Sequence, residues 1–525
     1  IDKPLEPVTI TPKKAFDYYD GVGVNIHLRF GSTVYYNQFN SIIYPRLREL
    51  GVKNVRDGLP YEAFLNKGDE TLIKNRFIQL YETLGIKTCY LLDSSKIIDN
   101  VDLLNKAAYL SVFENSEPLR NTVKYIEGFN EPDLTIYGLY PVDWASYTHT
   151  IQKSMWNRAR STNSLAKFPI IAPSLVTYWS IPSRPGMVSS ISPHISNFFD
   201  YANFHSYDTG AHDTSSFPGH YYDSGADRFD TVQQKKPFVI TEIGYQNAIG
   251  WNMPTSSNYA PNRYHYLSEL ASAKYYSVLF MELFSRGAKT IYTYELIDQD
   301  TSNQNSAEMN FGLLHTDGST KPAFNVIKNT LSLFQDTATN FTPADITFNL
   351  SGSITGIKYA VYQKSNGNYL IGIWQDKTRG VCYDFATLTD LASINQNVQF
   401  TFPSKFTQAN VYQPLVSNTP IKTYFNNDAI NINIPDNLIV LELINDVISA
   451  ENSFIIYPNP TSDFITVQLN IAEKEEIKIY NPLGQLVKKV EVSNNDKIDV
   501  SELLDGVYFI RLNKKDSPTL KFIKL

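Results

Sequence analysis

The sequence predicts an α/β chain in which a (β/α)8 barrel is followed by an antiparallel β-sandwich and a small C-terminal β-sandwich. Short apolar runs alternate with segments of helical spacing over roughly 320 residues, which matches the repeat number and size of the barrel fold. Several of these runs end in polar or charged residues, as barrel strands do at the face that carries active sites. After about residue 340 the hydrophobic period changes from 3.6 to 2, which indicates strands.

The barrel repeat can be followed strand by strand. Helical spacing over 36–50 and around 70–84 is closed each time by a glycine, Gly51 and Gly85, a residue that commonly ends helices. Further helices are expected near 97–113, 142–160 and 322–335. The eight strands are expected at 21–28, 52–57, 86–93, the run from Val123 to Asn130, 168–174, 199–207, 237–242 and 290–296.

Two of these strands end in a glutamate. One apolar run breaks at Asn130 and Glu131, and Pro132 follows; because proline biases the preceding residue towards extended backbone, we expect Glu131 to be extended. Glu242 ends the run 237–242 in the same way. Two carboxylates, each at the end of its own buried strand, are what cleavage of a glycosidic bond requires. The sequence therefore predicts a glycoside hydrolase.

Each glutamate also has a simpler explanation. Glu131, with Pro132 and Asp133, would suit a helix start, where a carboxylate balances the helix dipole. Glu242 would be a surface residue at a strand end. The pairing of both on strands four and seven favours catalysis, and the rival function is a non-catalytic carbohydrate-binding cell-surface protein on a barrel scaffold.

The pairing resembles the clan-A retaining glycoside hydrolases, and the similarity covers about 15–335. The motifs Gly-Val-Asn-Ile-His-Leu, Asn-Phe-His-Ser-Tyr and Gly-Leu-Leu-His-Thr-Asp-Gly-Ser-Thr-Lys-Pro-Ala-Phe look like bacterial barrels of families 39 and 5, and Gly-Phe-Asn-Glu-Pro-Asp also suggests a family 128-like β-1,3-glucanase. The resemblance implies that Glu131 is the acid/base and Glu242 the nucleophile, with carboxyl groups about 5–5.5 Å apart. It further implies that Asn130 binds the sugar's 2-hydroxyl and that Arg56 supports an ionised Glu242; for Arg56, an ion pair with Asp57 or another rim acid is the alternative.

Other strand ends offer possible sugar contacts, although each residue could equally be a hydrogen-bonded packing residue at the barrel mouth. The clan often has a tryptophan at the end of strand eight, where this chain has Tyr294. Long segments at 208–226, 244–262 and 297–312 are expected to wall a substrate cleft and favour cleavage inside a polysaccharide chain. The additional candidates for substrate binding are His205, Tyr207, Asn25, His27, Tyr294, Glu295 and, in the second of these segments, Trp251.

Composition excludes several other classes. The net charge of −7 and a pI near 5.7 give no support for nucleic-acid binding. A metal hydrolase would want clustered ligands such as His-x-His on strand one, where only His27 occurs, so we expect no metal and no cofactor. No apolar segment is long enough to span a bilayer, and a start at Ile1 is typical of a processed secreted protein. We expect a monomer whose cysteines, Cys89 and Cys382, are buried free thiols.

The last part of the chain carries its own signal. We expect the barrel domain at 1–340, an accessory β-sandwich at 341–446, a linker at 447–453 and a third unit at 454–525. That third unit contains Tyr-Pro-Asn-Pro-Thr-Ser-Asp, Ile-Tyr-Asn-Pro-Leu-Gly-Gln and Gly-Val-Tyr-Phe-Ile-Arg-Leu, and it ends in Lys-Phe-Ile-Lys-Leu. These motifs resemble the C-terminal sorting domain of the type IX secretion system of Bacteroidetes. The resemblance implies that this machinery is a partner and that the protein is exported across the outer membrane, to the cell surface or the medium.

Overall fold

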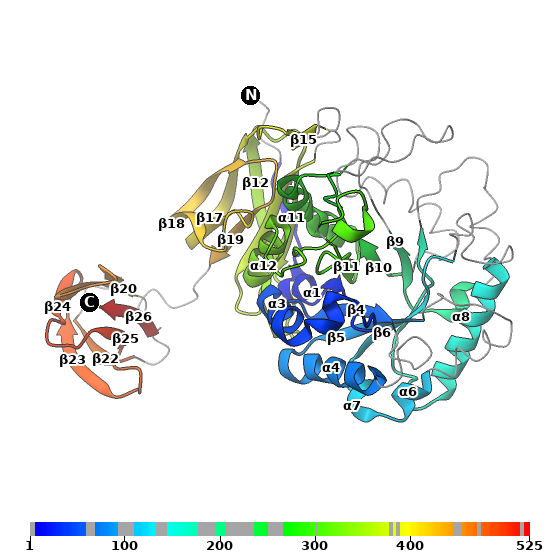
Figure 1. Cartoon of the computed structure of the whole chain (residues 1–525). Coiled ribbons are helices and arrows are strands. Elements are labelled where there is room, and N and C mark those ends of the chain that lie inside the picture. The colour runs from blue at the N-terminus through cyan, green and yellow to red at the C-terminus, as the bar shows by residue number, and fades with distance from the viewer. Residues whose placement is uncertain are drawn as a thin grey trace. The chain divides into compact units, whose positions relative to one another are not determined.

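The structure is a computed structural model of the 525-residue chain (Figure 1). The chain folds as two compact units, Ile1–Leu443 and Ile444–Leu525. The residues that the structure describes are 6–58, 69–92, 110–132, 144–176, 195–205, 207, 236–249, 266–300, 302–376, 382–384, 389–444, 454–469, 474–514 and 519–525.

A nearly closed barrel of parallel strands forms the centre of the first unit and confirms the predicted (β/α)8 architecture. Its strands follow the order β7-β6-β5-β4-β3-β11-β10-β9-β8. The fifth predicted strand consists of two short pieces, because Pro173 lies between them and cannot donate to a sheet. The strands are β3 (Val22–Asn25), β4 (Asn54–Gly58), β5 (Lys87–Leu92), β6 (Val123–Phe129), β7 (Ile170–Ile171), β8 (Leu175–Val176), β9 (Ala202–His205), β10 (Phe238–Ile243) and β11 (Ile291–Thr293).

Helices surround the barrel, and three of the five predicted helices match single elements: α4 (Asp69–Leu84), α8 (Trp144–Ser161) and α12 (Pro322–Phe334). The predicted helix at 36–50 is divided into three pieces, and α3 ends at Gly51 with φ of 81°. Most of the predicted helix near 97–113 lies outside the described residues. The remaining helical elements are α1 (Ala15–Tyr19), α2 (Val34–Asn37), η1 (Phe39–Ile43), α3 (Tyr44–Leu50), α6 (Ser111–Glu114), α7 (Glu117–Asn121), η5 (Ile195–Phe198), α11 (Glu269–Ser285) and η6 (Glu308–Asn310).

The helix α11 is buried along nearly its whole length, from Ala271 to Phe284. It packs against the barrel and also against the second sheet, where Lys274 pairs with Asp436 at 2.7 Å and the indole of Trp374 donates to Glu282 at 3.1 Å (Figure 1). A helix that is apolar on all sides is a buried helix. This helix is not among those predicted from the sequence, because a helix covered on both sides has no polar face to set a period of 3.6.

The second sheet of the first unit takes strands from both ends of that unit. Its order is β1-β12-β17-β19-β14-β13-β2, with β18 on β17, and its apolar core is separate from that of the barrel. The predicted strands near 397–402 and 408–413 form one long strand, β17, whose pairing is irregular between Thr401 and Phe406. The strands are β1 (Val8–Ile10), β2 (Lys13–Lys14), β12 (Ile346–Gly352), β13 (Ile357–Gln363), β14 (Tyr369–Gln375), β17 (Gln396–Tyr412), β18 (Pro420–Ile434) and β19 (Ile439–Ile444); β15 (Tyr383–Asp384) and β16 (Thr389–Asp390) pair separately.

The second unit has two antiparallel sheets around one small core. One sheet contains β20 (Phe454–Tyr457), β21 (Phe464–Leu469) and β24 (Asp496–Asp499). The other contains β22 (Glu475–Tyr480), β23 (Leu486–Val492), β25 (Gly506–Leu512) and β26 (Thr519–Lys524). None of the helices that the structure describes combines the length and apolar character needed to cross a membrane. Both cysteines are buried and free, as predicted.

Candidate active site

A buried arginine lies at the centre of the barrel mouth. Arg56 is the third of the five residues of β4, is only 2% exposed, and donates to both oxygens of Glu127 at 2.6 and 2.9 Å. Its remaining N–H groups reach Glu242 Oε1 at 2.6 Å, Asn130 Oδ1 at 2.7 Å and Asn25 Oδ1 at 2.9 Å. The planar guanidinium suits such a bidentate contact and stays charged when it is buried among acids. Arg56 therefore holds residues from β3, β6 and β10 in one fixed arrangement.

Glu242 on β10 accepts hydrogen bonds from two sides. Arg56 donates to Oε1, and the Tyr207 hydroxyl donates to Oε2 at 2.5 Å. Burial disfavours the charged carboxylate, but the charges of His205 and Arg56 and these hydrogen bonds outweigh burial, so the pKa of Glu242 lies below its ordinary value. Glu242 is thus ionised in the neutral range.

Glu131 follows β6 and faces the same space. Its Oε1 is 2.6 Å from Nδ1 of His205. The expectation of extended backbone at Glu131 is wrong, because φ is 46°, in the left-handed region. The Glu131 N–H bonds to the carbonyl of Ser174 at 2.8 Å, and this bond bends the chain across towards the neighbouring strand piece. Such a conformation costs about 1–3 kcal/mol and is typical of residues that must be aimed.

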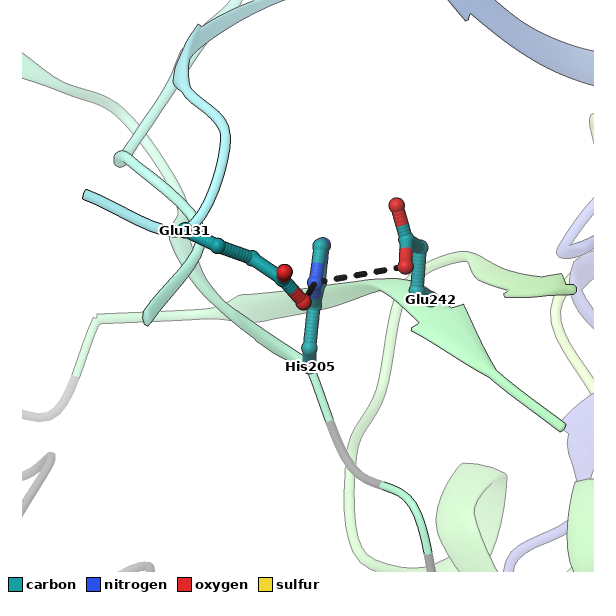
Figure 2. A group of neighbouring side chains, drawn as sticks. All are labelled: Glu131, His205 and Glu242. Carbon is teal, nitrogen blue, oxygen red and sulfur yellow. Dashed lines mark hydrogen bonds and ion pairs between the residues drawn. The ribbon is translucent and has the colours of Figure 1, made fainter. Parts of the chain in front are cut away.

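His205, the last residue of β9, stands between the two carboxylates (Figure 2). Nδ1 contacts Glu131 and lies 3.4 Å from Glu242 Oε2, while Nε2 bonds to the Thr241 hydroxyl at 3.0 Å. Burial lowers the pKa of this imidazole, but the two carboxylates raise it further, so the net direction is upward. The imidazole of His205 therefore links the two acids.

The same three side chains are also the one group of potential metal ligands among the described residues. Glu131, His205 and Glu242 each offer one ligand atom, and these atoms lie within 4.8 Å of one another. However, Arg56 donates to Glu242, and Nδ1 of His205 faces Glu131 at hydrogen-bond distance. A guanidinium beside the ligand set repels a cation, so the arrangement suits two acids that exchange protons better than it suits a metal ion.

A second group of side chains forms the rim above β3 and β11. Glu295 is fully buried; it accepts from Tyr35 at 2.8 Å and is 3.2 Å from Nε2 of His27. Burial lowers the pKa of His27, but the hydrogen bond and charge of Glu295 raise it more. Asn25 is also buried and donates to the carbonyls of Thr241 and Thr293. For Asn25 and Glu295 this geometry favours the packing role, whereas His27 reaches the surface of the mouth.

Tyr294 follows β11 directly, at the end of the eighth predicted strand. Its ring lies edge-on to those of Tyr207, His27 and Phe311 at centroid distances of 6.4, 5.7 and 5.6 Å. The backbone at Gly244 can lie close to that of Tyr294 because glycine has no Cβ; a Cβ there would lie 2.2 Å from the Tyr294 carbonyl oxygen. The Tyr294 hydroxyl donates to Glu308 at 2.6 Å.

The structure thus brings together every sequence-predicted site residue except Trp251, which lies outside the described residues. Asp57 does not pair with Arg56; it accepts from the N–H groups of Leu28 and Gly58 and faces Arg29 at 3.6 Å. Sequence reasoning missed Glu127, which is fully buried and also accepts from Asn203 and Thr241. The signal for this pair was available in the sequence: an acidic residue lies inside one apolar run, and an arginine lies inside another.

Comparison with known proteins identifies one part of the chain. Residues 455–524 match the family model of the secretion system C-terminal sorting domain. The second unit is a sorting domain. It directs the protein to export by the type IX secretion system, to the cell surface or the medium, as the sequence predicted. A stretch of 67 residues is 48% identical to β-agarase A from Zobellia galactanivorans, and the match covers 12% of this chain and 12% of that protein.

The barrel and its sheet resemble solved structures in fold. A family 39 glycoside hydrolase from the gut symbiont Bacteroides cellulosilyticus is 15% identical, with a TM-score of 0.51 over 83% of each chain. A glucosidase from Croceicoccus marinus is 9% identical, with a TM-score of 0.52 over 84% of this chain and 97% of that one. At such identities the likeness concerns the fold.

Proposed function

We propose that the protein is a secreted glycoside hydrolase that cleaves O-glycosidic bonds inside a polysaccharide with retention of configuration. The observation that carries the proposal is the arrangement of Glu131 and Glu242. They come from the ends of β6 and β10, and with His205 they offer ligand atoms within 4.8 Å of one another. Two carboxyl groups about 5–5.5 Å apart suit a retaining mechanism, because there is no room for a water between nucleophile and sugar. Two solved structures of similar fold carry the names glycoside hydrolase and glucosidase.

In the proposed mechanism, Glu242 is the nucleophile. Its ionised carboxylate attacks the anomeric carbon, while Arg56 and Tyr207 keep it aimed and charged. Glu131 gives its proton to the leaving glycosidic oxygen and then removes a proton from the water that releases the sugar. His205 contacts Glu131 and lies close to Glu242, so it stabilises Glu131 as that residue changes from acid to base.

The remaining parts of the chain take supporting roles in this proposal. Asn130 lies beside the acid/base, and His27 and Tyr294 line the mouth as sugar contacts. We propose that the barrel at 1–340 carries catalysis and that the sheet at 341–446 supports it. The segment 447–453 joins them to the sorting domain. Internal cleavage is tested by the size of the products, because an enzyme acting inside the chain releases mixed oligosaccharides at early times.

The first prediction concerns the two acids. Glu131→Gln and Glu242→Gln each lower the release of reducing ends from the active polysaccharide, by about 100-fold or more, because each removes proton transfer or the nucleophile. A screen of plant, algal and microbial polysaccharides supplies the substrate. Glu82→Gln, at an exposed position of α4, is the matched control and leaves the rate unchanged.

If either active-site variant keeps full activity, the substituted residue has no catalytic role. If NMR at early times shows the inverted anomer first, the proposed retention of anomeric configuration is wrong. A wild-type protein that binds a polysaccharide without turnover, with affinity unchanged in Glu131→Gln, is instead a non-catalytic carbohydrate-binding protein.

A further inference from the structure

A buried threonine next to Glu242 contacts the imidazole of His205 at the ring nitrogen that does not face the acids. Thr241 lies on β10 and is fully buried, and its Oγ1 is 3.0 Å from Nε2 of His205. Neighbouring residues of a regular strand point to opposite faces, but the pairing of β10 with β9 is irregular between Ile240 and Glu242. Thr241 and Glu242 therefore both reach His205, Thr241 at Nε2 and Glu242 near Nδ1.

The Thr241 hydroxyl has one hydrogen, and two acceptor oxygens compete for it. Its Oγ1 is 3.0 Å from Glu127 Oε1 and 3.0 Å from Asn203 Oδ1. Both oxygens of Glu127 accept from Arg56, so they have no hydrogen to give. The amide nitrogen of Asn203 faces two other acceptors, Glu127 and the Ala172 carbonyl, and this identifies the atom that faces Thr241 as the amide oxygen. The hydrogen of Thr241 therefore points to one of these two oxygens.

This direction fixes the hydrogen of the imidazole. Because its own hydrogen is turned towards Glu127 or Asn203, the Thr241 hydroxyl accepts from Nε2 of His205. Nε2 then carries a hydrogen in the neutral ring as well as in the charged one, and Nδ1 of the neutral ring is an acceptor. Nδ1 is 2.6 Å from Glu131 Oε1, a separation at which two acceptors need a proton between them. One proton is therefore shared by Nδ1 and Glu131.

We propose that Thr241, held by Glu127 and Asn203, is a positioning residue that keeps a hydrogen on Nε2 of His205, so that Nδ1 exchanges one proton with Glu131. The proton passes between the ring nitrogen and the carboxylate oxygen, and no other bond changes. This inference rests on the proposed function, because the exchanged proton is the one that Glu131 needs when it acts on the leaving oxygen.

The opposite arrangement of the ring would not serve the acid. A neutral imidazole with its only hydrogen on Nδ1 would donate to an ionised Glu131, which has no proton to give. It could not release that hydrogen without becoming an anion, because Nε2 would carry none. The hydroxyl of Thr241 therefore selects the form of His205 that can return a proton to Glu131.

NMR of the full chain, labelled at the histidine ring nitrogens, tests the position of the hydrogen without a substrate. The nitrogen shift separates a ring nitrogen that carries a hydrogen from a bare one, and His205→Asn identifies the His205 signals by their loss. We expect Nε2 to carry a hydrogen in the wild-type protein at neutral pH. Thr241→Val keeps the branched shape but leaves Nε2 without its acceptor, so we expect the hydrogen to move to Nδ1. Thr241→Ser restores the hydroxyl and the wild-type signals.

Kinetics on the polysaccharide that the screen identifies test the consequence for turnover. Thr241→Val lowers kcat about tenfold or more and leaves KM within about twofold, because Thr241 acts on the proton of Glu131 and is buried away from substrate. Thr241→Ser keeps kcat within about threefold, since a hydroxyl is again present. The matched control is Thr290→Val, which removes a buried hydroxyl that bonds to that of Tyr125 at the opposite end of the barrel. It changes neither kinetic value nor the His205 signals.

The outcomes separate this inference from the proposed function. A bare Nε2 in the wild-type protein overturns the inference and leaves the hydrolase intact, and this signal decides the point even if Thr241→Val does not fold. His205 signals that are the same in Thr241→Val as in the wild-type protein also overturn it, as does an equal loss of kcat in Thr241→Val and Thr241→Ser. If the signals change as expected but no polysaccharide is cleaved, the hydrolase is wrong and the role of Thr241 at His205 is supported.

Discussion

Arg56 sets the charge of its neighbours at the scale of single residues. Because it is buried and bonded to both Glu127 and Glu242, its own pKa is raised well above the ordinary value despite the cost of burial. Glu242 remains ionised as the pH falls, since its folded pKa lies below the ordinary 4.5. Its hydrogen bonds therefore persist at acidic pH and weaken only when the pH drops through the lowered value.

This arrangement predicts the acid limb of activity. We expect the midpoint of the acid limb of kcat/KM in the wild-type protein to lie below pH 4.5, the ordinary pKa of a glutamate. Tyr207→Phe removes one hydrogen bond to the charged form, so the limb moves to higher pH. The measurement is kcat/KM from pH 3 to 7, with Tyr424→Phe on the second sheet as the control. If the acid limb does not shift in Tyr207→Phe, the Tyr207 hydroxyl does not influence the ionisation of Glu242.

The site residues that could be predicted from the sequence are those that interrupt an apolar run. Glu131 and Glu242 were found because each ends an apolar run at the face where barrel strands finish. Glu127 was missed because it lies inside such a run, where its charge is balanced by a residue 71 positions away. Glu308 was missed because nothing in the order of residues shows that its segment folds back over Tyr294. The left-handed backbone of Glu131 could not be predicted either. Pro132 favours an extended Glu131, but the hydrogen bond from the Glu131 N–H to the Ser174 carbonyl overrides that preference.

At the scale of elements, α11 joins the barrel to the second sheet. The ammonium of Lys274 and the carboxylate of Asp436 are both buried, so each depends on the other. Lys274→Met leaves Asp436 without its partner and lowers the free energy of unfolding of the first unit by about 3–5 kcal/mol. The double variant Lys274→Met with Asp436→Leu recovers most of that loss, because it removes both buried charges.

Thermal or denaturant unfolding of the first unit measures these changes. Arg158→Gln breaks an exposed pair with Glu114 on the barrel surface and serves as the control, with an effect under about 1 kcal/mol. A double variant no more stable than Lys274→Met alone would contradict the mutual dependence of the two charges.

Among the helices, those with a polar face were predictable, and the buried one was not. The amphipathic helices α4 and α12 match their predicted positions, because each has one face in water and one in the core. The hairpin of β13 and β14 was predictable from its turn, although β14 is buried along its whole length. Buried α11 lacks that contrast. The break between β7 and β8 depends on Pro173, whose effect on a strand cannot be judged until its neighbours in the sheet are known.

At the scale of the whole molecule, the two units have separate cores, whereas the second sheet, besides its own core, contributes side chains to that of the barrel. Tyr362, Leu370 and Trp374 of the sheet belong to the barrel's apolar cluster. A chain that ends at Leu443 is therefore expected to keep kcat/KM within about twofold, because a unit with its own core folds alone. A chain that ends at residue 340 is expected to be insoluble, since it exposes the buried side of α11.

Expression of both shortened chains, followed by gel filtration and assay of reducing-end release, checks this pair of predictions. Activity in the chain that ends at 340 would show that the barrel needs no sheet. Loss of activity in the chain that ends at Leu443 would give the sorting domain a part in catalysis.

The strand β1 has a consequence for storage and handling of the protein. It covers the edge of β12 through only three paired residues, Val8 with Phe348, Thr9 with Thr347 and Ile10 with Ile346. Proteolytic clipping of that short segment would uncover a row of unpaired amides along β12. Such a bare edge is a template for another copy of the chain. Self-association of aged preparations should therefore begin at β12, and should track the loss of Val8–Ile10 in intact-mass measurements.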